Sequence, residues 1–246
     1  MYQQNIYRIV DNLPLAKEVF RLRLEGDTQF VTAPGQFVNI QLEGNFLRRP
    51  ISVCDWDDHS FTLIYKVVGI GTAQLSRMQP GESLNLLTGL GNGFSLELCG
   101  ATPLLVGGGV GVPPLYGLAK RLAAAGKPPV VVLGFRTVDD LFYQQEFEAL
   151  GCRTIVATED GSAGIQGFVT DAIRQAAPDY DSYCCCGPEA MLHAVYDLCG
   201  LNGQLSFERR MGCGFGACMG CSCETKYGAR RICKYGPVLK GEEIIW

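Results

Sequence analysis

The stretch TPLLVGGGVGVPPL, residues 102–115, predicts the architecture of the second half of this chain. It opens with an apolar run, continues into the glycine-rich turn GGGVG, and then reaches Pro113 and Pro114. Proline is tolerated in the first turn of a helix because the amide donors there have no helical partner. The stretch therefore predicts a buried strand, a tight turn and a helix in direct succession.

The segments that follow repeat this order of strand and helix as far as residue 208. Strand-like runs cover 102–108, 128–135, 153–159, 181–187 and 203–208, and helical patterns cover 114–126, 139–151, 167–177 and 188–200. Such alternation predicts crossover units that build a doubly wound parallel sheet. Ligands of such sheets bind at the carboxyl ends of the strands. We therefore expect an α/β domain over residues 100–208.

The first 99 residues follow a different pattern. Short alternating runs at 18–26, 36–44, 51–57, 60–68 and 82–89 are separated by Gly, Pro, Asn and Asp. Brief strands at near-regular spacing predict an antiparallel barrel or sandwich. One helix is expected over residues 71–78, with Thr72 as its N-cap.

Residues 209–246 are rich in cysteine and short of periodicity, which predicts a small appended lobe. Cys213, Cys218 and Cys221 form C-x4-C-x2-C, and Cys233 follows after eleven intervening residues. This is the plant-type spacing of a [2Fe–2S] centre, and the intervening glycines allow the backbone to wrap around it. A structural zinc site is the alternative, although zinc ligands more often come as two C-x2-C knuckles. Cys223 is left as a spare thiol.

Composition excludes several classes of function. The chain has 246 residues, 12 cysteines and a formal net charge of −4, which argues against nucleic acid as a partner. No apolar run approaches the roughly 18 residues of a membrane span, and no export signal is visible at the N-terminus. We expect a cytoplasmic protein, in which cysteines serve metal or redox chemistry rather than disulfides.

Two stretches of the first domain have residues suited to a dinucleotide. LRRPIS contains Arg48 and Arg49, one of which can neutralise a pyrophosphate, and then Ser52, which can hydrogen-bond a flavin ring edge. In IYKVVGIGT, Tyr65 and Lys66 precede a turn with free amide groups at Gly71 and Thr72. Taken singly, the arginines could be a solvated strand edge, Tyr65 ordinary strand packing, and Gly71 an ordinary turn.

The second domain offers a nicotinamide site. The turn after residue 106 departs from the G-x-G-x-x-G fingerprint because Val112 replaces its third glycine, which disfavours an ordinary Rossmann dehydrogenase. Residues expected at the strand ends are Gly109, Gly111, Cys186, Gly187 and Pro188, with Arg136 near a ribose or 2′-phosphate. The choice between NAD and NADP stays open. Neither His59 nor His193 has a catalytic partner in the sequence, and no catalytic triad or carboxylate pair is found.

Five stretches in this order resemble the ferredoxin-reductase-type flavoproteins, and more closely the electron-transfer subunits of dihydroorotate dehydrogenase B: RRPIS, the GIGT turn, VGGGVGVPP, CCGPEAM and the four-cysteine pattern. The resemblance implies an antiparallel β-barrel FAD domain (1–99), an NAD-binding domain (100–208) and a [2Fe–2S] lobe (209–246). It implies that FAD is held by Arg49, Pro50, Ile51, Ser52, Ile64, Tyr65, Lys66, Gly71 and Thr72. It implies that Cys213, Cys218, Cys221 and Cys233 are the cluster ligands.

The chemistry of these cofactors agrees with that resemblance. Nicotinamide exchanges a hydride and an iron–sulfur cluster exchanges single electrons, whereas a flavin does both. The resemblance further implies an FMN-containing catalytic subunit that oxidises dihydroorotate in pyrimidine biosynthesis, two of each subunit in a heterotetramer, and electron flow through the cluster and FAD to NAD. One alternative is the small subunit of a ferredoxin–NADP reductase or sulfide dehydrogenase complex. A third is a zinc-stabilised interaction module without redox function.

Overall fold

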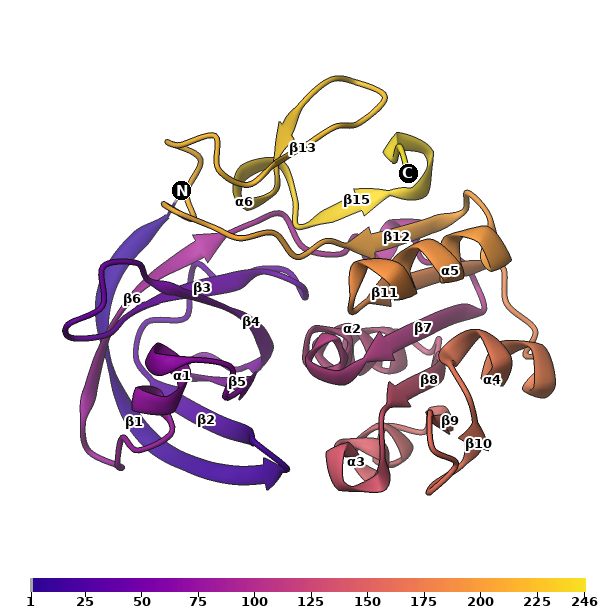
Figure 1. Cartoon of the computed structure of the whole chain (residues 1–246), viewed down its shortest axis with the longest axis horizontal. Helices are drawn as coiled ribbons and strands as arrows, with labels where there is room; N and C mark the ends of the chain where they lie inside the picture. The colour runs from indigo at the N-terminus through magenta and orange to yellow at the C-terminus, as the bar shows by residue number, and fades with distance from the viewer. Residues whose placement is uncertain (1) are drawn as a thin grey trace.

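The computed structural model describes residues 2–246, which form a barrel, an α/β unit and a cysteine-rich segment packed on both (Figure 1). The barrel is closed in the order β1-β2-β5-β4-β3-β6, and every pairing in it is antiparallel. Its strands are β1 (Gln3–Ala16), β2 (Val19–Glu25), β3 (Phe37–Gln41), β4 (Arg49–Trp56), β5 (Ser60–Lys66) and β6 (Ser83–Leu90). Of the two antiparallel architectures that the sequence allows, the chain forms the barrel.

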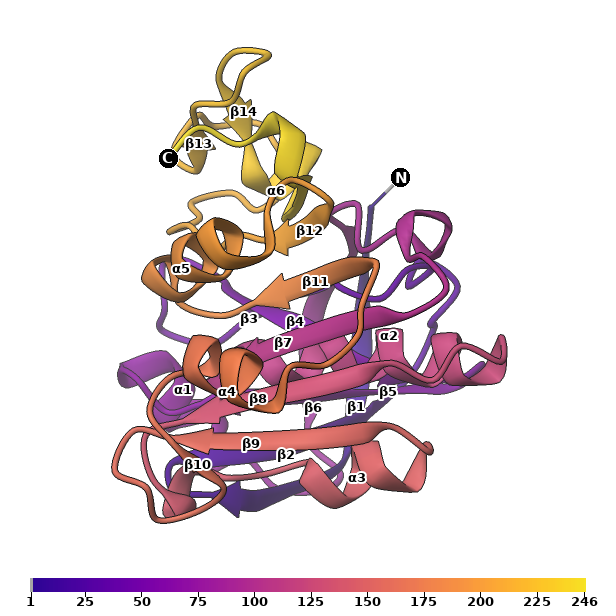
Figure 2. The same cartoon turned by 90° about the vertical axis from the view of Figure 1, so that its right-hand side faces the viewer.

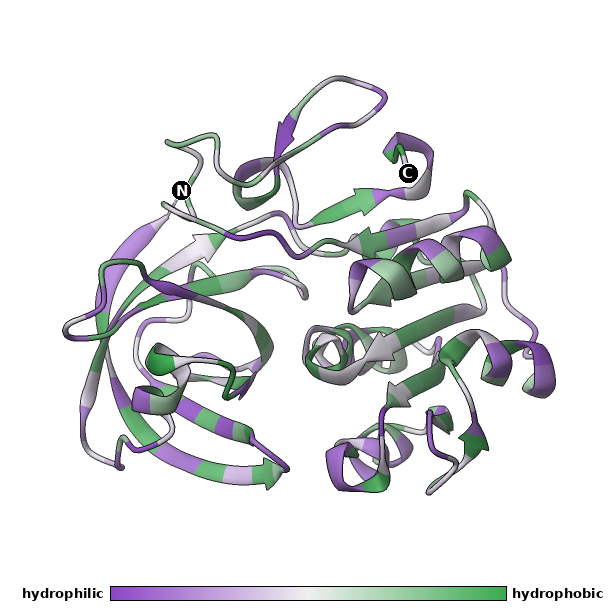
Figure 3. Ribbon diagram, in the orientation of Figure 1, coloured by the Kyte–Doolittle hydropathy of each residue, from purple (hydrophilic) through white to green (hydrophobic). Residues whose placement is uncertain are grey.

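The longest barrel strand, β1, is absent from the runs read from sequence. It pairs with β2 on one side and with β6 on the other, so it closes the barrel. Only Tyr7 and Ile9 of this strand are buried, because the rest is half-buried or exposed. Figure 3 shows the alternation of hydrophilic and hydrophobic residues along the barrel strands. In β1 that signal is weak, which explains why periodicity does not predict it.

Helix α1 (Ile70–Leu75) is shorter than predicted and starts elsewhere. Gly69, with an extended backbone, is its N-cap, and Thr72 stands in the third helical position. The Thr72 hydroxyl accepts hydrogen bonds from the N–H groups of Val68 at 2.9 Å and Gly69 at 3.2 Å. The expectation that Thr72 is the N-cap is therefore wrong, because its hydroxyl reaches back to the residues that precede the helix.

The α/β unit is a seven-stranded sheet in the order β10-β9-β8-β7-β11-β12-β15, with parallel pairing except at β15. Its parallel strands are β7 (Pro103–Gly108), β8 (Val130–Phe135), β9 (Arg153–Thr158), β10 (Ile165–Gln166), β11 (Ser182–Cys186) and β12 (Gly203–Ser206). Helices α2 (Val112–Ala124) and α3 (Gln144–Ala149) pack on one face. Helices α4 (Val169–Ala176) and α5 (Glu189–Cys199) pack on the other (Figure 2), so the predicted doubly wound sheet is confirmed.

The predicted helix over 139–151 is only partly formed. A short 3-10 turn (Val138–Asp140) comes first, and Tyr143 then adopts a left-handed backbone with φ of 66° before α3 begins. This break allows the ring of Phe142 to pack against Phe135, with centroids 5.2 Å apart, and that of Tyr143 against Tyr116 at 4.9 Å. Tertiary packing of these aromatic rings overrides the helical propensity of the segment.

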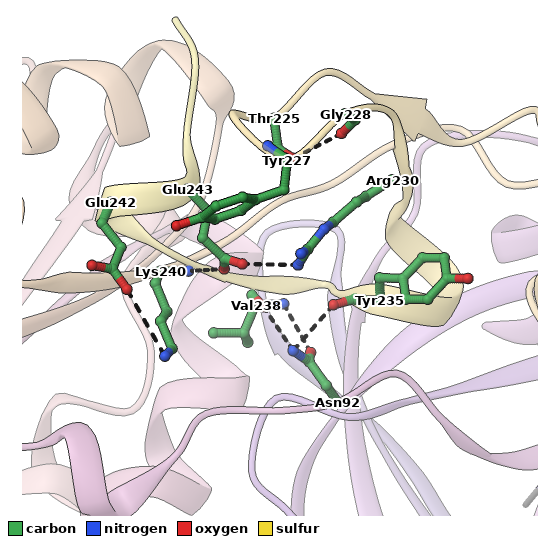
Figure 4. Close-up of polar contacts among 10 residues, drawn as sticks. All are labelled: Asn92, Thr225, Tyr227, Gly228, Arg230, Tyr235, Val238, Lys240, Glu242 and Glu243. Carbon is green, nitrogen blue, oxygen red and sulfur yellow. Dashed lines mark hydrogen bonds and ion pairs between the residues drawn. The ribbon is translucent and has the colours of Figure 1, made fainter.

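The C-terminal segment contains β13 (Ser222–Cys223), β14 (Arg230–Arg231), α6 (Ile232–Tyr235) and β15 (Val238–Lys240), followed by a 3-10 turn (Gly241–Glu243). Strand β15 pairs antiparallel with β12, so part of this segment completes the α/β sheet. Asn92, just after the barrel strand β6, holds it from the other side by hydrogen bonds to Val238 and Tyr235 (Figure 4). None of the helices within residues 2–246 is long and apolar enough to span a membrane.

Candidate functional site

A cleft of about 610 Å³ lies where the carboxyl ends of β7, β8 and β11 face the barrel. Its walls include Gly108–Gly111, Gly134–Arg136, Gly187 and Pro188 from the α/β unit, and Val19 and Lys66 from the barrel. Strand ends of a parallel sheet form the usual ligand site of such folds, and the size suits part of a dinucleotide. Of the residues predicted for nicotinamide binding, Gly109, Gly111, Gly187, Pro188 and Arg136 all line this cleft.

The glycine turn packs closely against β11. A Cβ atom at Gly111 would lie 2.2 Å from the carbonyl oxygen of Cys186, which no side chain can tolerate. Gly109 is different: its φ is +52°, and nothing lies within 4 Å of a Cβ placed there. Gly111 therefore permits the close packing of turn and strand, while Gly109 leaves the cleft open to a ligand.

The side chain of Cys186 lies in the core rather than in the cleft. The residue is 2% exposed and packs among the side chains beneath α2. Burial, and after it the charge of Glu208, raises the pKa of the Cys186 thiol to about 12. The thiol is thus protonated at neutral pH, and only the main chain of Cys186 approaches the glycine turn.

Glu208 is a cleft residue that the sequence reading missed. It lies two residues after the end of β12 and lines the cleft as an exposed residue, and desolvation raises the pKa of its carboxyl above the ordinary value. An acidic residue at the carboxyl end of the predicted strand 203–208 is the signal that could have identified it.

On the barrel side, the two arginines of the RRPIS stretch have separate roles. The Arg48 guanidinium is held by the carbonyl oxygens of Asn39 and Asn85, both at 3.2 Å, and by two side-chain oxygens, those of Gln41 and Asn85, both at 3.0 Å. Arg48 therefore ties strands together. Arg49 donates to Asn45 at 2.6 Å, and a Cβ atom at Gly71 would lie 2.3 Å from its Nε.

Arg49 and Gly71 thus form a cradle that any side chain at position 71 would fill. The cradle brings a guanidinium next to the first turn of α1, where amide groups lack helical partners. A cation beside free N–H groups fits one phosphate of a dinucleotide. Pro50, Ile51 and Ser52 continue along β4 from Arg49, half-buried and paired with β3.

Three further residues predicted for FAD lie on β5, and two of them are buried on opposite faces of the strand: Ile64 in the core beneath α2 and Tyr65 in the barrel core. Ile64 and Tyr65 are 3% and 1% exposed. The Tyr65 hydroxyl donates to Asn12 at 3.0 Å, and burial raises its pKa to about 12. Only the main chain of these two residues is available to a ligand. Lys66 lines the cleft and lies 3.5 Å from Asp140 of the α/β unit.

The four predicted ligand cysteines form two pairs. The Sγ atoms of Cys213 and Cys218 are 3.4 Å apart, and those of Cys221 and Cys233 are 3.3 Å apart. Within residues 2–246, no three His, Cys, Asp or Glu side chains converge on a point that a single metal ion could occupy. One tetrahedral zinc needs all four sulfurs about 3.8 Å from one another. Two separate pairs fit a two-iron cluster with two thiolates on each iron.

The loop around these cysteines supplies N–H groups to sulfur. The N–H of Cys218 donates to Cys213 Sγ at 3.4 Å, and that of Cys233 to Cys221 Sγ at 3.5 Å. Burial opposes ionisation of Cys213, but amide donors including those of Cys218 and Phe215 outweigh it and lower the pKa to about 6. Such donors stabilise thiolates, the form that binds iron.

Of the remaining candidates of the sequence, Cys223 and His193 belong to neither the cleft nor the sulfur pairs, while two glycines belong to the cysteine loop. Cys223 is in β13, half-buried, and burial raises the pKa of its thiol. Gly214 and Gly216 have φ of +78° and +90°, which the wrapped loop requires. His193 stacks on Trp246 with ring centroids 4.5 Å apart, away from the cleft.

Comparisons with known proteins agree with this geometry. Residues 208–245 match the domain family described as the iron-sulfur cluster binding domain of dihydroorotate dehydrogenase B. Residues 105–197 match the oxidoreductase NAD-binding domain. A protein of Geobacillus sp. named dihydroorotate dehydrogenase B (NAD(+)), electron transfer subunit, is 44% identical, with all of both chains covered. One of Lysinibacillus sphaericus with the same name is 43% identical over 97% of each chain.

Solved structures share the fold. The NADH-dependent reduced ferredoxin–NADP oxidoreductase, studied for flavin-based electron bifurcation, aligns with a TM-score of 0.87 at 32% identity and covers 98% of this chain and 90% of its own. A ferredoxin–NADP+ reductase of Neisseria gonorrhoeae aligns with a TM-score of 0.69 at 17% identity over 79% of this chain and 89% of its own. At that identity the second likeness concerns the fold alone.

Proposed function

Because this chain belongs to the family of dihydroorotate dehydrogenase B (NAD(+)) electron transfer subunits, we propose that it carries electrons between a catalytic partner subunit and NAD(H). The observation that carries the proposal is the presence, in one compact chain, of two cysteine pairs and of a cleft at the end of the parallel sheet. The chain is then an oxidoreductase component and needs no acid–base triad.

Three cofactors fit the residues present. Arg49 and Gly71, with the main chain of β4 and β5, would hold FAD. The pairs Cys213 with Cys218 and Cys221 with Cys233 would hold a [2Fe–2S] cluster. The cleft beside Gly109 and Gly187 would take NAD. When bound, the flavin supplies the conversion between hydride transfer and single-electron transfer.

The protein itself contributes binding and fixed distances. Gly109 lets a dinucleotide approach the main chain of the turn, and Arg136 offers a charge to its ribose or phosphate groups. Lys66 of the barrel and Asp140 of the α/β unit form an ion pair at the edge of the cleft. This contact helps to hold the flavin strands and the nicotinamide cleft in one relative position, which hydride transfer requires.

The partner we propose is an FMN-containing subunit that oxidises dihydroorotate, in a heterotetramer of two subunits of each kind in the cytoplasm. Electrons would pass from FMN through the cluster and FAD to NAD+. The naming of full-length relatives as electron transfer subunits of dihydroorotate dehydrogenase B supports a catalytic partner. Copurification with a dihydroorotate-oxidising subunit is the test. A larger iron–sulfur flavoprotein in its place would favour a ferredoxin–NADP reductase or sulfide dehydrogenase complex.

The chemistry is tested by reduction with NADH in the absence of oxygen. We expect a brown protein whose flavin and cluster absorbances both bleach. Cys218→Ala should abolish the cluster signal because one iron loses a thiolate, while bleaching of the flavin persists. Cys223→Ser is the matched control and should keep the full spectrum, since Cys223 belongs to neither sulfur pair.

Two results would contradict the proposal. Stoichiometric zinc without iron and acid-labile sulfide in the wild-type protein would favour the interaction module instead. Loss of the cluster from Cys223→Ser, with retention in Cys218→Ala, would show that the ligand assignment is wrong.

A further inference from the structure

Two asparagines of the barrel region hold the cysteine-rich segment, and only one is fully partnered. Asn92 donates to the Val238 carbonyl at 2.7 Å and accepts from the Val238 N–H at 3.1 Å. Asn39, in β3, donates from Nδ2 to the main-chain carbonyl of Cys213 at 3.1 Å. Its Oδ1 is buried and has no hydrogen-bond partner among the described residues. A buried unsatisfied amide oxygen is costly, so its retention calls for a reason.

The cysteine loop, residues 211–223, lies directly on the Asn39 amide. Asn39 is 1% exposed, and a Cβ atom at Gly214 would lie 2.4 Å from its Nδ2. Gly214 also has a φ of +78°, which disfavours any other residue. The loop thus has a fixed entry point at Cys213, set by one hydrogen bond and one close contact.

Asn39 also belongs to the strand pair that carries the proposed flavin residues. In the β3–β4 register it lies opposite Pro50, between Arg49 and Ile51. Its main-chain carbonyl accepts from the Arg48 guanidinium at 3.2 Å. Asn39 therefore contacts the cysteine loop through its side chain, and through its backbone it pairs with β4, the strand proposed to hold the flavin.

We propose that Asn39 is a positioning residue that sets the reduction potential of the cluster by fixing the entry of the cysteine loop onto the flavin strand. The inference rests on the proposed function, since it needs a cluster at the two cysteine pairs. In a trans peptide the C=O and N–H groups point in opposite directions. By holding the Cys213 carbonyl toward the barrel, Asn39 turns the following N–H, that of Gly214, away from it.

The orientation of this peptide determines the direction in which the N–H groups of the following residues point. Among them is the Cys218 N–H, 3.4 Å from Cys213 Sγ. Reduction adds one negative charge to a cluster, and N–H dipoles aimed at sulfur stabilise that charge. A loop released at Cys213 loses part of this stabilisation. Without Asn39, the cluster should therefore be harder to reduce, while the flavin is unaffected.

The test uses the full chain in complex with its partner subunit, poised without oxygen at a series of NADH to NAD+ ratios. Electron paramagnetic resonance measures the reduced cluster, and absorbance measures the flavin. In Asn39→Leu, which removes both hydrogen-bonding groups, the ratio of reduced to oxidised cluster should fall about tenfold at a given poise, with altered g values. Asn39→Asp keeps the shape, removes a donor and adds charge, so it should shift the ratio the same way.

Asn12→Leu is the matched control. Asn12 is a barrel asparagine whose amide donates to Leu75 and Met78, at 2.8 and 3.0 Å, and accepts from the Tyr65 hydroxyl at 3.0 Å, so none of these hydrogen bonds involves the cysteine loop. It should leave the cluster titration and spectrum unchanged even if it weakens the barrel. This separates general destabilisation from the effect of Asn39.

The outcomes separate the two proposals. Wild-type protein without iron and sulfide contradicts the proposed function itself. If the wild-type protein contains the cluster and the folded Asn39 variants give the same titrations and spectra as the wild type, the proposed role of Asn39 is overturned. The proposed function of the chain then still stands. Loss of iron from both Asn39 variants with flavin retained supports it. Loss of flavin and fold in both overturns it in favour of a purely structural asparagine.

Discussion

Among single residues, two acids near the cleft have pKa values shifted in opposite directions, Glu208 upward and Glu189 downward. Desolvation raises the pKa of Glu208, which lines the cleft after β12. The Arg209 guanidinium, hydrogen-bonded at 2.8 Å, lowers the pKa of Glu189 at the start of α5. A raised carboxyl pKa means that the folded state holds the proton more tightly than the unfolded chain does. The ionised Glu208 therefore costs stability, but only slightly, because the residue is exposed and solvent screens its charge.

Glu208→Gln should raise the thermal midpoint of the protein slightly at pH 7 to 8, because the neutral amide avoids this small cost. The gain should disappear near pH 4, where the Glu208 carboxyl is protonated in both the folded and the unfolded chain. The unfavourable contribution of Glu208 to stability arises only as the pH rises through its raised pKa. Glu189→Gln is the control of opposite sign: it should lower the midpoint at pH 7 and have little effect at pH 3. Thermal denaturation followed by circular dichroism measures both. A pH-independent gain for Glu208→Gln would contradict the assignment.

At the scale of elements, the turn between β7 and α2 combines two different uses of glycine. Gly111 has no room for a side chain because the Cys186 carbonyl lies where its Cβ would be, at 2.2 Å. Gly109 has that room but a φ of +52°. The first glycine serves packing of the turn on β11, and the second serves the cleft.

The two alanine variants should separate these uses. Gly111→Ala should cost about 1–3 kcal/mol of unfolding free energy, because the turn and β11 must move apart. Gly109→Ala should cost about 1 kcal/mol from backbone strain and place a methyl group toward the ligand. We therefore expect the larger drop in thermal midpoint for Gly111→Ala. For a given loss of stability, Gly109→Ala should cause the larger rise in the KM for NADH. Equal effects of both variants on both measurements would contradict this division.

In the whole molecule, the barrel and the α/β unit pack directly against each other. Helix α2 packs on β4 so closely that a Cβ atom at Gly117 would lie 2.6 Å from the Cys54 carbonyl. Polar contacts surround this point: Lys120 lies 2.6 Å from Asp55, and the Arg121 guanidinium lies 3.4 Å from the centre of the Trp56 ring. This interface determines the distance between β4 and β5, which we propose to hold the flavin, and the cleft proposed for nicotinamide.

Gly117→Ala should push this interface apart. Alanine gains about 1 kcal/mol in helix propensity, which offsets part of an overpacking cost of about 1–3 kcal/mol. The thermal midpoint should therefore change little or fall. The rate of flavin reduction by NADH in stopped-flow measurements should fall about tenfold, because hydride transfer depends on close approach. A higher midpoint with an unchanged rate would show that the interface has room for the methyl group.

The local patterns of the sequence determined the chemistry of this protein and much of its fold. The cysteine spacing, the glycine-rich turn and the alternation of strand and helix each lie within a short stretch, where chain geometry alone limits the structure. They predicted the doubly wound sheet, the antiparallel first domain and a [2Fe–2S] site within residues 213–233.

Packing of the folded chain determines which side chains of those stretches reach the sites. Tyr65 and Cys186 belong to the predicted motifs, yet strand register turns both side chains into cores. Glu208 and Asn39 belong to no motif, yet the fold places Glu208 in the lining of the cleft and Asn39 against the main chain of Cys213. The facing of a residue on a strand depends on pairing and packing across the whole chain, and a stretch of sequence contains no direct record of these.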